Sequence, residues 1–74
     1  MKLADAENGK NYRVLSINGG RGVVSNLYSL GIYPGSVIKV SNKSFFHGPL
    51  KVSINGTQVA LGRGISEKVL VEEV

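Results

Sequence analysis

The sequence predicts a small, mostly β domain: a barrel of about five to six short strands with one short α-helix after the first strand. A chain of 74 residues buries only about 60 to 65% of its unfolded surface, so residues 1–74 have room for a single core. Ten glycines and few helix-forming runs are typical of short strands joined by tight turns. An Asn-Gly pair between two alternating apolar runs adds a β-hairpin.

The first strand is predicted over residues 12–18 and another over residues 36–41, because both segments are rich in Val, Ile and Leu and bounded by glycine or proline. Neither alternates cleanly, since each contains two adjacent apolar residues, Val14 with Leu15 and Val37 with Ile38. We interpret this as the pattern of a small closed barrel whose strands are covered on part of both faces. Residues 69–71 are expected to form a last strand that closes the sheet.

A short amphipathic helix is predicted between these two strands, because Val23, Leu27 and Leu30 recur at spacings of four and three. Gly31 suits the left-handed position after a helix, and Ile32 is then expected to pack back on Leu27 as in a Schellman motif. The start of the helix lacks an obvious side-chain cap.

Residues 19–22, Gly-Gly-Arg-Gly, lie between a strand and a helix, which is where a phosphate cradle would be found. They match neither the dinucleotide-binding fingerprint nor a P-loop. We therefore interpret them as a steric connection between strand and helix rather than as an anion site.

The hairpin is predicted over residues 50–61 around Asn55 and Gly56, because a type I′ turn needs a positive φ at both central residues. A two-residue loop also fixes the register of the two strands. It predicts three pairs that place the large apolar groups on one face: Ile54 with Thr57, Val52 with Val59, and Leu50 with Leu61.

The composition excludes several classes of protein. With no cysteine, disulfides and thiolate-bound metals are excluded, which fits a reducing cytoplasm. The N-terminus lacks the apolar segment of a signal peptide, and no stretch approaches the roughly 20 apolar residues of a membrane span. We expect a cytoplasmic protein without direct membrane insertion.

The formal net charge of +4 makes nucleic-acid binding the alternative function. Phosphate binding requires basic residues gathered on one face, whereas here they are spread along the whole chain. We interpret the charge as an ordinary solvated surface and expect no nucleic-acid partner. A small basic barrel that binds RNA or DNA remains the competing hypothesis.

The residues needed for catalysis or metal binding are missing. His47 is the only histidine, so it cannot form a set of nitrogen and sulfur ligands by itself, and we expect no enzyme activity and no cofactor. Phe45 and Phe46 beside it are expected to cap the core rather than to dock a partner. Tyr28 and Tyr33 fit two roles equally well: interface anchors or covers of the barrel edge.

Taken together, these elements resemble the FeoA family, the ferrous iron transport protein A domain, over nearly the whole chain. The resemblance rests on the run Leu27-x-x-Leu30-Gly31-Ile32-x-Pro34-Gly35, then Gly48-Pro49, Val59-Ala60-Leu61, Val69 and Val71, preceded by Leu3 and Gly9.

The resemblance implies an SH3-like barrel in the cytoplasm that docks on and modulates the membrane GTPase transporter FeoB in ferrous iron uptake, without catalysis. The same fold is similar to the C-terminal module of metal-dependent repressors, so a stand-alone relative of that module is a further alternative. A weak homodimer is compatible with exposed sheet edges. The predicted partner-binding residues are Tyr28, Tyr33, Pro34 and Arg63.

Overall fold

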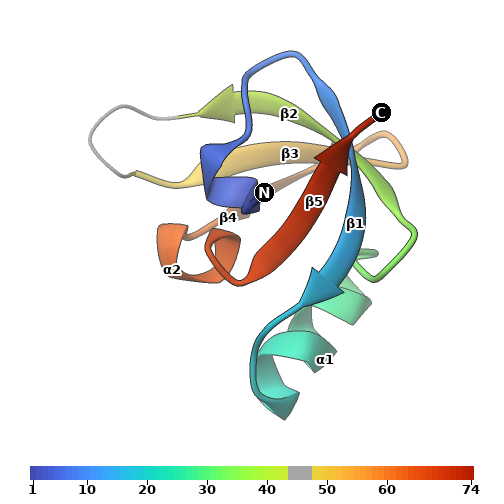
Figure 1. Cartoon of the computed structure of the whole chain (residues 1–74), viewed down its shortest axis with the longest axis vertical. Helices are drawn as coiled ribbons and strands as arrows, with labels where there is room; N and C mark the ends of the chain where they lie inside the picture. Colours follow the sequence, from blue (N-terminus) through green and yellow to red (C-terminus); the bar gives the residue numbers. More distant parts are fainter. Residues whose placement is uncertain (44–47) are drawn as a thin grey trace.

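The computed structural model in Figure 1 describes residues 1–43 and 48–74. Eight elements follow one another along the chain: η1 (a 3₁₀ helix, Leu3–Asp5), β1 (Asn11–Ile17), α1 (Arg21–Ser29), β2 (Val37–Lys43), β3 (Leu50–Ile54), β4 (Thr57–Leu61), α2 (Arg63–Ser66) and β5 (Val69–Glu73).

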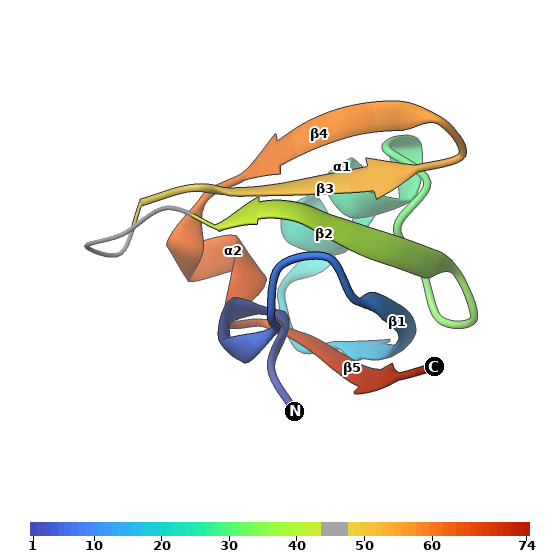
Figure 2. The ribbon, with the colours of Figure 1, turned by 90° about the horizontal axis from the view of Figure 1, so that it is seen from above.

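The five strands form one antiparallel sheet in the order β4-β3-β2-β1-β5. The sheet curls, so that the β3–β4 hairpin lies on one side of the molecule and β5 on the other (Figure 2). This confirms the prediction of a mostly β domain with five to six strands and a helix after the first. The predicted last strand pairs with β1, and among the described residues no ladder joins the two margins, β4 and β5.

The inner face of the sheet and the segments that cover it form a single core. Apolar burial of this kind is the main source of stability in a domain of this size. Its buried members come from every strand, from α1 and from the N-terminal segment: Leu3, Ala6, Tyr12, Val14, Leu27, Ile32, Ile38, Val40, Leu50, Val52, Ile54, Leu61, Val69 and Val71.

The hairpin prediction is confirmed in its turn and in its register. Asn55 and Gly56 have φ values of 50° and 81°, as a type I′ turn requires. β3 and β4 pair as predicted, from Ile54 with Thr57 to Leu50 with Leu61. Turn chemistry and apolar alternation therefore specify the same pairing.

The prediction that the adjacent apolar pairs of β1 and β2 are covered on part of both faces is wrong. Val14 and Ile38 are buried, whereas their neighbours Leu15 and Val37 are exposed. Within the part of the chain that the structure describes, the buried core packs on the inner face of the curled sheet, and successive side chains of a strand point to opposite faces. A shift in the β1–β5 register between Val14 and Ser16 accompanies the exposed Leu15.

The end of α1 follows the predicted Schellman geometry. The Ile32 N–H donates to the Leu27 carbonyl at 2.8 Å, the Gly31 N–H donates to the Tyr28 carbonyl at 3.0 Å, and Gly31 has a φ of 90°. Leu27 and Ile32 are both fully buried, as expected. Leu30 does not join them, because it is the C-cap residue and the turn at Gly31 directs Ile32 into the core instead.

The start of α1 also agrees with the sequence. Gly20 is the N-cap, and no side chain caps the helix. A Cβ atom added to Gly19 would lie 3.0 Å from Cγ1 of Val23, closer than such atoms normally come. This close approach supports the interpretation of the Gly-Gly-Arg-Gly stretch as a steric connection.

Two short helices were not predicted. η1 buries Leu3 and Ala4 beneath β5, and α2 connects β4 to β5 with the Ser66 hydroxyl donating to the Gly62 carbonyl at 3.0 Å. Within residues 1–43 and 48–74, no helix is long and apolar enough to cross a membrane.

Candidate docking surface

Residues 1–43 and 48–74 offer little material for an internal reaction site. Within these ranges, Ser66 is the one polar side chain that is buried, and no group of three or more His, Cys, Asp or Glu side chains is placed to bind a metal ion. The predictions for Phe45, Phe46 and His47 fall outside the described residues. The candidate functional residues within these ranges therefore lie on the surface.

Several large apolar side chains are exposed to solvent. Exposed aromatic residues are of particular interest because tyrosine supplies contact area and a polar hydroxyl with little loss of side-chain entropy. Among residues 1–43 and 48–74, the large apolar residues that are exposed are Met1, Leu15, Tyr28, Leu30, Tyr33, Val37, Leu70 and Val74.

Tyr28, Tyr33 and Pro34 form what we call the aromatic corner, at the connection between α1 and β2. The two tyrosine rings lie 5.7 Å apart between centroids and are tilted by 45°. They are 51% and 43% exposed, and Pro34, which follows Tyr33, is also exposed. This pair has favourable aromatic geometry while about half of its surface stays open to a partner.

The backbone under the aromatic corner is fixed by hydrogen bonds. The Ser36 hydroxyl donates to the Tyr33 carbonyl at 2.7 Å and accepts from the Tyr33 N–H at 3.1 Å. The Gly35 N–H donates to the Val14 carbonyl at 2.8 Å, which ties the turn to β1. The exposed rings are thus carried on an ordered turn, which lowers the entropy lost when a partner binds.

Leu15 and Val37 are two further exposed apolar residues, on the strands β1 and β2. Val37 pairs with Arg13 across the β1–β2 ladder. Leu15 lies two residues further along β1 and directly follows Val14, whose carbonyl accepts a hydrogen bond from the Gly35 N–H. Both residues were predicted to lie on strands that are covered on part of both faces. The alternation of charged Arg13 with apolar Val14 was the sequence signal that could have placed Leu15 on the outside.

Arg63, the fourth predicted partner-binding residue, lies away from the aromatic corner. The corner adjoins the turn end of the hairpin, since a Cβ atom on Gly31 would lie 3.3 Å from Cγ2 of Ile54, whereas Arg63 follows the opposite end of β4. Its Nε is 3.2 Å from Oε1 of Glu67, the C-cap residue of α2. Figure 1 shows α2 and the α1–β2 turn on different sides of the molecule.

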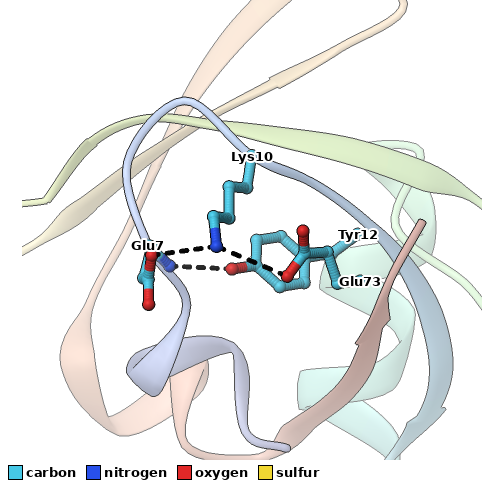
Figure 3. Close-up of polar contacts among 4 residues, drawn as sticks. All are labelled: Glu7, Lys10, Tyr12 and Glu73. Atoms are coloured by element: carbon cyan, nitrogen blue, oxygen red, sulfur yellow. Dashed lines mark hydrogen bonds and ion pairs between the residues drawn. The ribbon is translucent and has the colours of Figure 1, made fainter.

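A small polar cluster joins the N-terminal segment to β1 and β5 (Figure 3). Lys10 Nζ lies 3.1 Å from Oε2 of Glu7 and 3.6 Å from Oε1 of Glu73, and the Glu7 N–H donates to the Tyr12 hydroxyl at 2.9 Å. The hydrogen bond with Glu7, the attraction to Glu7 and the weaker attraction to Glu73 raise the pKa of Lys10 above its ordinary value. The cluster holds the chain ends together and forms no reaction site.

The remaining charges leave a positive excess on the surface. Arg13 pairs with Glu72 at 3.1 Å, so that of the acidic residues only Asp5 is without an ion pair within the part of the chain that the structure describes. Basic residues without an ion pair in that part are Lys2, Arg21, Lys39, Lys51 and Lys68. They come from five different segments of the chain.

Comparison with known proteins places these features in a family. The chain is 38% identical over 71 residues to the Methanocaldococcus jannaschii protein named "Putative Fe(2+) transport protein A", an alignment that covers 96% of this chain and 84% of the relative. A crystal structure of an iron uptake regulatory protein, FeoA, superposes with a TM-score of 0.89 at 31% identity and covers 100% of this chain and 96% of that one.

The fold extends beyond iron transport proteins. A manganese-dependent transcriptional repressor matches with a TM-score of 0.90 at 23% identity, covering 100% of this chain and 41% of the repressor. This likeness concerns the fold alone, and it confirms the predicted SH3-like architecture. The model of the FeoA domain family matches residues 1–73. With this match over nearly its full length and the 38% identical relative, the chain belongs to the FeoA domain family, whose members are associated with Fe(2+) transport.

Proposed function

We propose that this chain is a non-catalytic accessory protein of ferrous iron uptake, which docks in the cytoplasm on a FeoB-type membrane GTPase and modulates its activity. Membership of the FeoA family supports the link to iron transport. The observation that carries the docking role is the exposed Tyr28–Tyr33 pair, tilted ring against ring, at the ordered connection between α1 and β2. Pro34 and the apolar residues Leu15 and Val37 enlarge this contact surface.

The aromatic corner suits protein docking for two physical reasons. Interface hot spots are enriched in tyrosine, where a ring buries a large apolar area and its hydroxyl still finds a polar partner. An ordered turn also loses little conformational entropy when a partner binds, so the entropic cost of binding is small. Arg63, whose side chain is 36% exposed, would make a second contact at the other end of the hairpin.

The experiment that tests this function is binding of the purified chain to the full-length FeoB of its host in nanodiscs, without nucleotide, with GDP and with a non-hydrolysable GTP analogue. We expect saturable binding whose affinity differs between nucleotide states. Empty nanodiscs provide the control for lipid binding. Absence of binding to FeoB in every nucleotide state would contradict the proposal.

The excess of basic side chains favours one competing function, nucleic-acid binding. Affinity for RNA or DNA would then fall steeply as salt increases, because neutralised phosphates release their counterions. We expect no binding of mixed-sequence RNA or double-stranded DNA at about 50 mM salt, where such contacts are strongest. Salt-sensitive binding under this condition would favour nucleic acid over FeoB as the partner.

A further inference from the structure

The two margins of the sheet differ in how their backbone groups are satisfied. At the β5 margin, the N-terminal residue covers the strand: the Val71 N–H donates to the Met1 carbonyl at 2.7 Å, and the Met1 amino group donates to the Val71 carbonyl at 3.0 Å. A bridge between Lys2 and Leu70 extends this cover. At the β4 margin, no backbone hydrogen bond to a segment other than β3 is found within residues 1–43 and 48–74.

The β3–β4 register identifies which groups of β4 are open. In a hairpin with a two-residue loop, the residues that flank the turn exchange both hydrogen bonds, and every second pair repeats this arrangement. Thr57, Val59 and Leu61 therefore direct their N–H and C=O groups toward β3. Gln58 and Ala60, both exposed, direct theirs away from the sheet.

β4 also lacks the features by which edge strands usually avoid pairing. Its sequence, Thr-Gln-Val-Ala-Leu, contains no proline and no charge, and its register with β3 runs without a bulge over all five pairs. Natural edge strands are commonly protected by lysine, proline, bulges or a covering segment. The open margin is therefore a template for one more antiparallel strand.

We propose that two copies of this chain pair through β4, antiparallel, about a twofold axis that passes beside Val59. In this register Gln58 lies opposite the partner's Ala60, and Ala60 lies opposite the partner's Gln58. Each of these two pairs exchanges two backbone hydrogen bonds, so all four open N–H and C=O groups of each strand are satisfied. The half-buried Val59 faces its own copy at the centre and loses its remaining exposure.

A second copy fits this margin because the strand is self-complementary. Gln58 and Ala60 each present one open N–H donor and one open C=O acceptor. The twofold operation places the N–H groups of one copy opposite the C=O groups of the other, without a shift in register. Each chain carries a net charge of +4, yet the neutral strand brings no like charges directly opposite one another. A contact of one five-residue strand is smaller than a standard interface, so the dimer is weak and dependent on concentration.

The test is sedimentation velocity from about 10 μM to about 1 mM, the range in which a weak dimer and its monomer are both populated. We expect reversible dimerisation of the unmodified chain. The double variant Gln58→Lys/Ala60→Lys places lysines directly opposite one another, and we expect it to be monomeric throughout this range. Gln58→Glu/Ala60→Lys instead creates two pairs of opposite charge at unchanged net charge, and we expect about two- to tenfold tighter pairing.

A control separates this local effect from general repulsion. Ser25→Lys/Asn26→Lys adds the same two charges to the exposed surface of α1 and is expected to dimerise like the unmodified chain. Hydrogen exchange provides a second measurement, in which the Gln58 and Ala60 amides gain protection as the concentration rises. A chain that stays monomeric at about 1 mM, leaving β4 free for an extended segment of another protein, overturns the proposal. So does a dimer that the opposed lysines weaken no more than the control does.

Discussion

The inner and outer sides of the α1–β2 connection differ sharply in exposure to solvent, although their residues are direct neighbours in the chain. Leu27 and Ile32 are fully buried, whereas Tyr28 and Tyr33, each the next residue, are 51% and 43% exposed. The inner pair closes the Schellman turn and fills the core, while the rings of the outer pair lie 5.7 Å apart on the surface. The difference indicates that the inner side maintains the fold and that the outer side is free to act on a partner.

The largest expected effect lies on the inner side. Leu27→Ala removes a fully buried side chain and is expected to lower the free energy of unfolding by about 2–5 kcal/mol, through lost apolar burial and the cavity left behind. Urea unfolding followed by circular dichroism measures this change. Leu30→Ala, at the 36% exposed C-cap, is the matched control and is expected to change the stability by less than about 1 kcal/mol.

Gly31→Ala tests the turn that separates the two sides. Gly31 has a φ of 90°, and the new methyl group would lie 3.3 Å from Cγ2 of Ile54. We expect a loss of about 1–3 kcal/mol from backbone strain and crowding together. Gly35→Ala shares the positive φ, 96°, but meets no atom within 4 Å, so thermal unfolding should show a smaller loss there. Equal losses would mean that contact with Ile54 contributes nothing.

Arg63→Gln probes the one predicted docking residue that lies outside the aromatic corner. Its ion pair with Glu67 is partly exposed and joins a basic residue to an acidic one four positions later, the weaker order on a helix. We expect the free energy of unfolding to fall by at most about 0.5 kcal/mol. A loss above about 1 kcal/mol in urea unfolding would assign Arg63 a structural role.

The smallest effect is expected at Lys10, far from the connection. The folded-state pKa of Lys10 is raised by Glu7 and then by Glu73, so its contribution to stability is present in full below the unfolded-state pKa of about 10.4. This contribution is lost as the pH rises through the higher folded-state pKa. Lys10→Met should therefore be slightly less stable than the unmodified chain at pH 7. The difference should shrink above pH ~10.4, and a difference that grows there would contradict the assignment.

Local signals in the sequence were sufficient for much of the fold. The Asn55–Gly56 turn fixes the register of its hairpin, because apolar alternation and turn geometry each require the same pairs. Gly31 marks the end of α1 for a similar reason, since few residues other than glycine accept its φ of 90°. These features depend on residues close together in the chain.

The features that sequence reasoning missed depend on contacts between distant segments. η1 is stabilised where Met1 pairs with Val71 and Leu3 enters the core, and no local pattern specifies either contact. The exposure of Leu15 and Val37 likewise depends on which face of β1 and β2 packs on the core, and segments distant in the chain decide this. Among the predicted docking residues, Tyr33 and Pro34 lie together because they are adjacent in sequence. Arg63 lies apart from them because it follows the end of β4 that is opposite the hairpin turn.

The docking role of the aromatic corner can be tested by measuring stability and FeoB binding on the same Tyr28→Ala/Tyr33→Ala variant. We expect the free energy of unfolding to change by less than about 1.5 kcal/mol, because both residues are about half exposed. We expect the affinity for FeoB in nanodiscs to fall at least about tenfold, or ~1.4 kcal/mol. Val74→Ala, a change at another exposed apolar side chain, should leave both unchanged. An unaltered affinity in the tyrosine variant would contradict the claim that the aromatic corner is the docking surface.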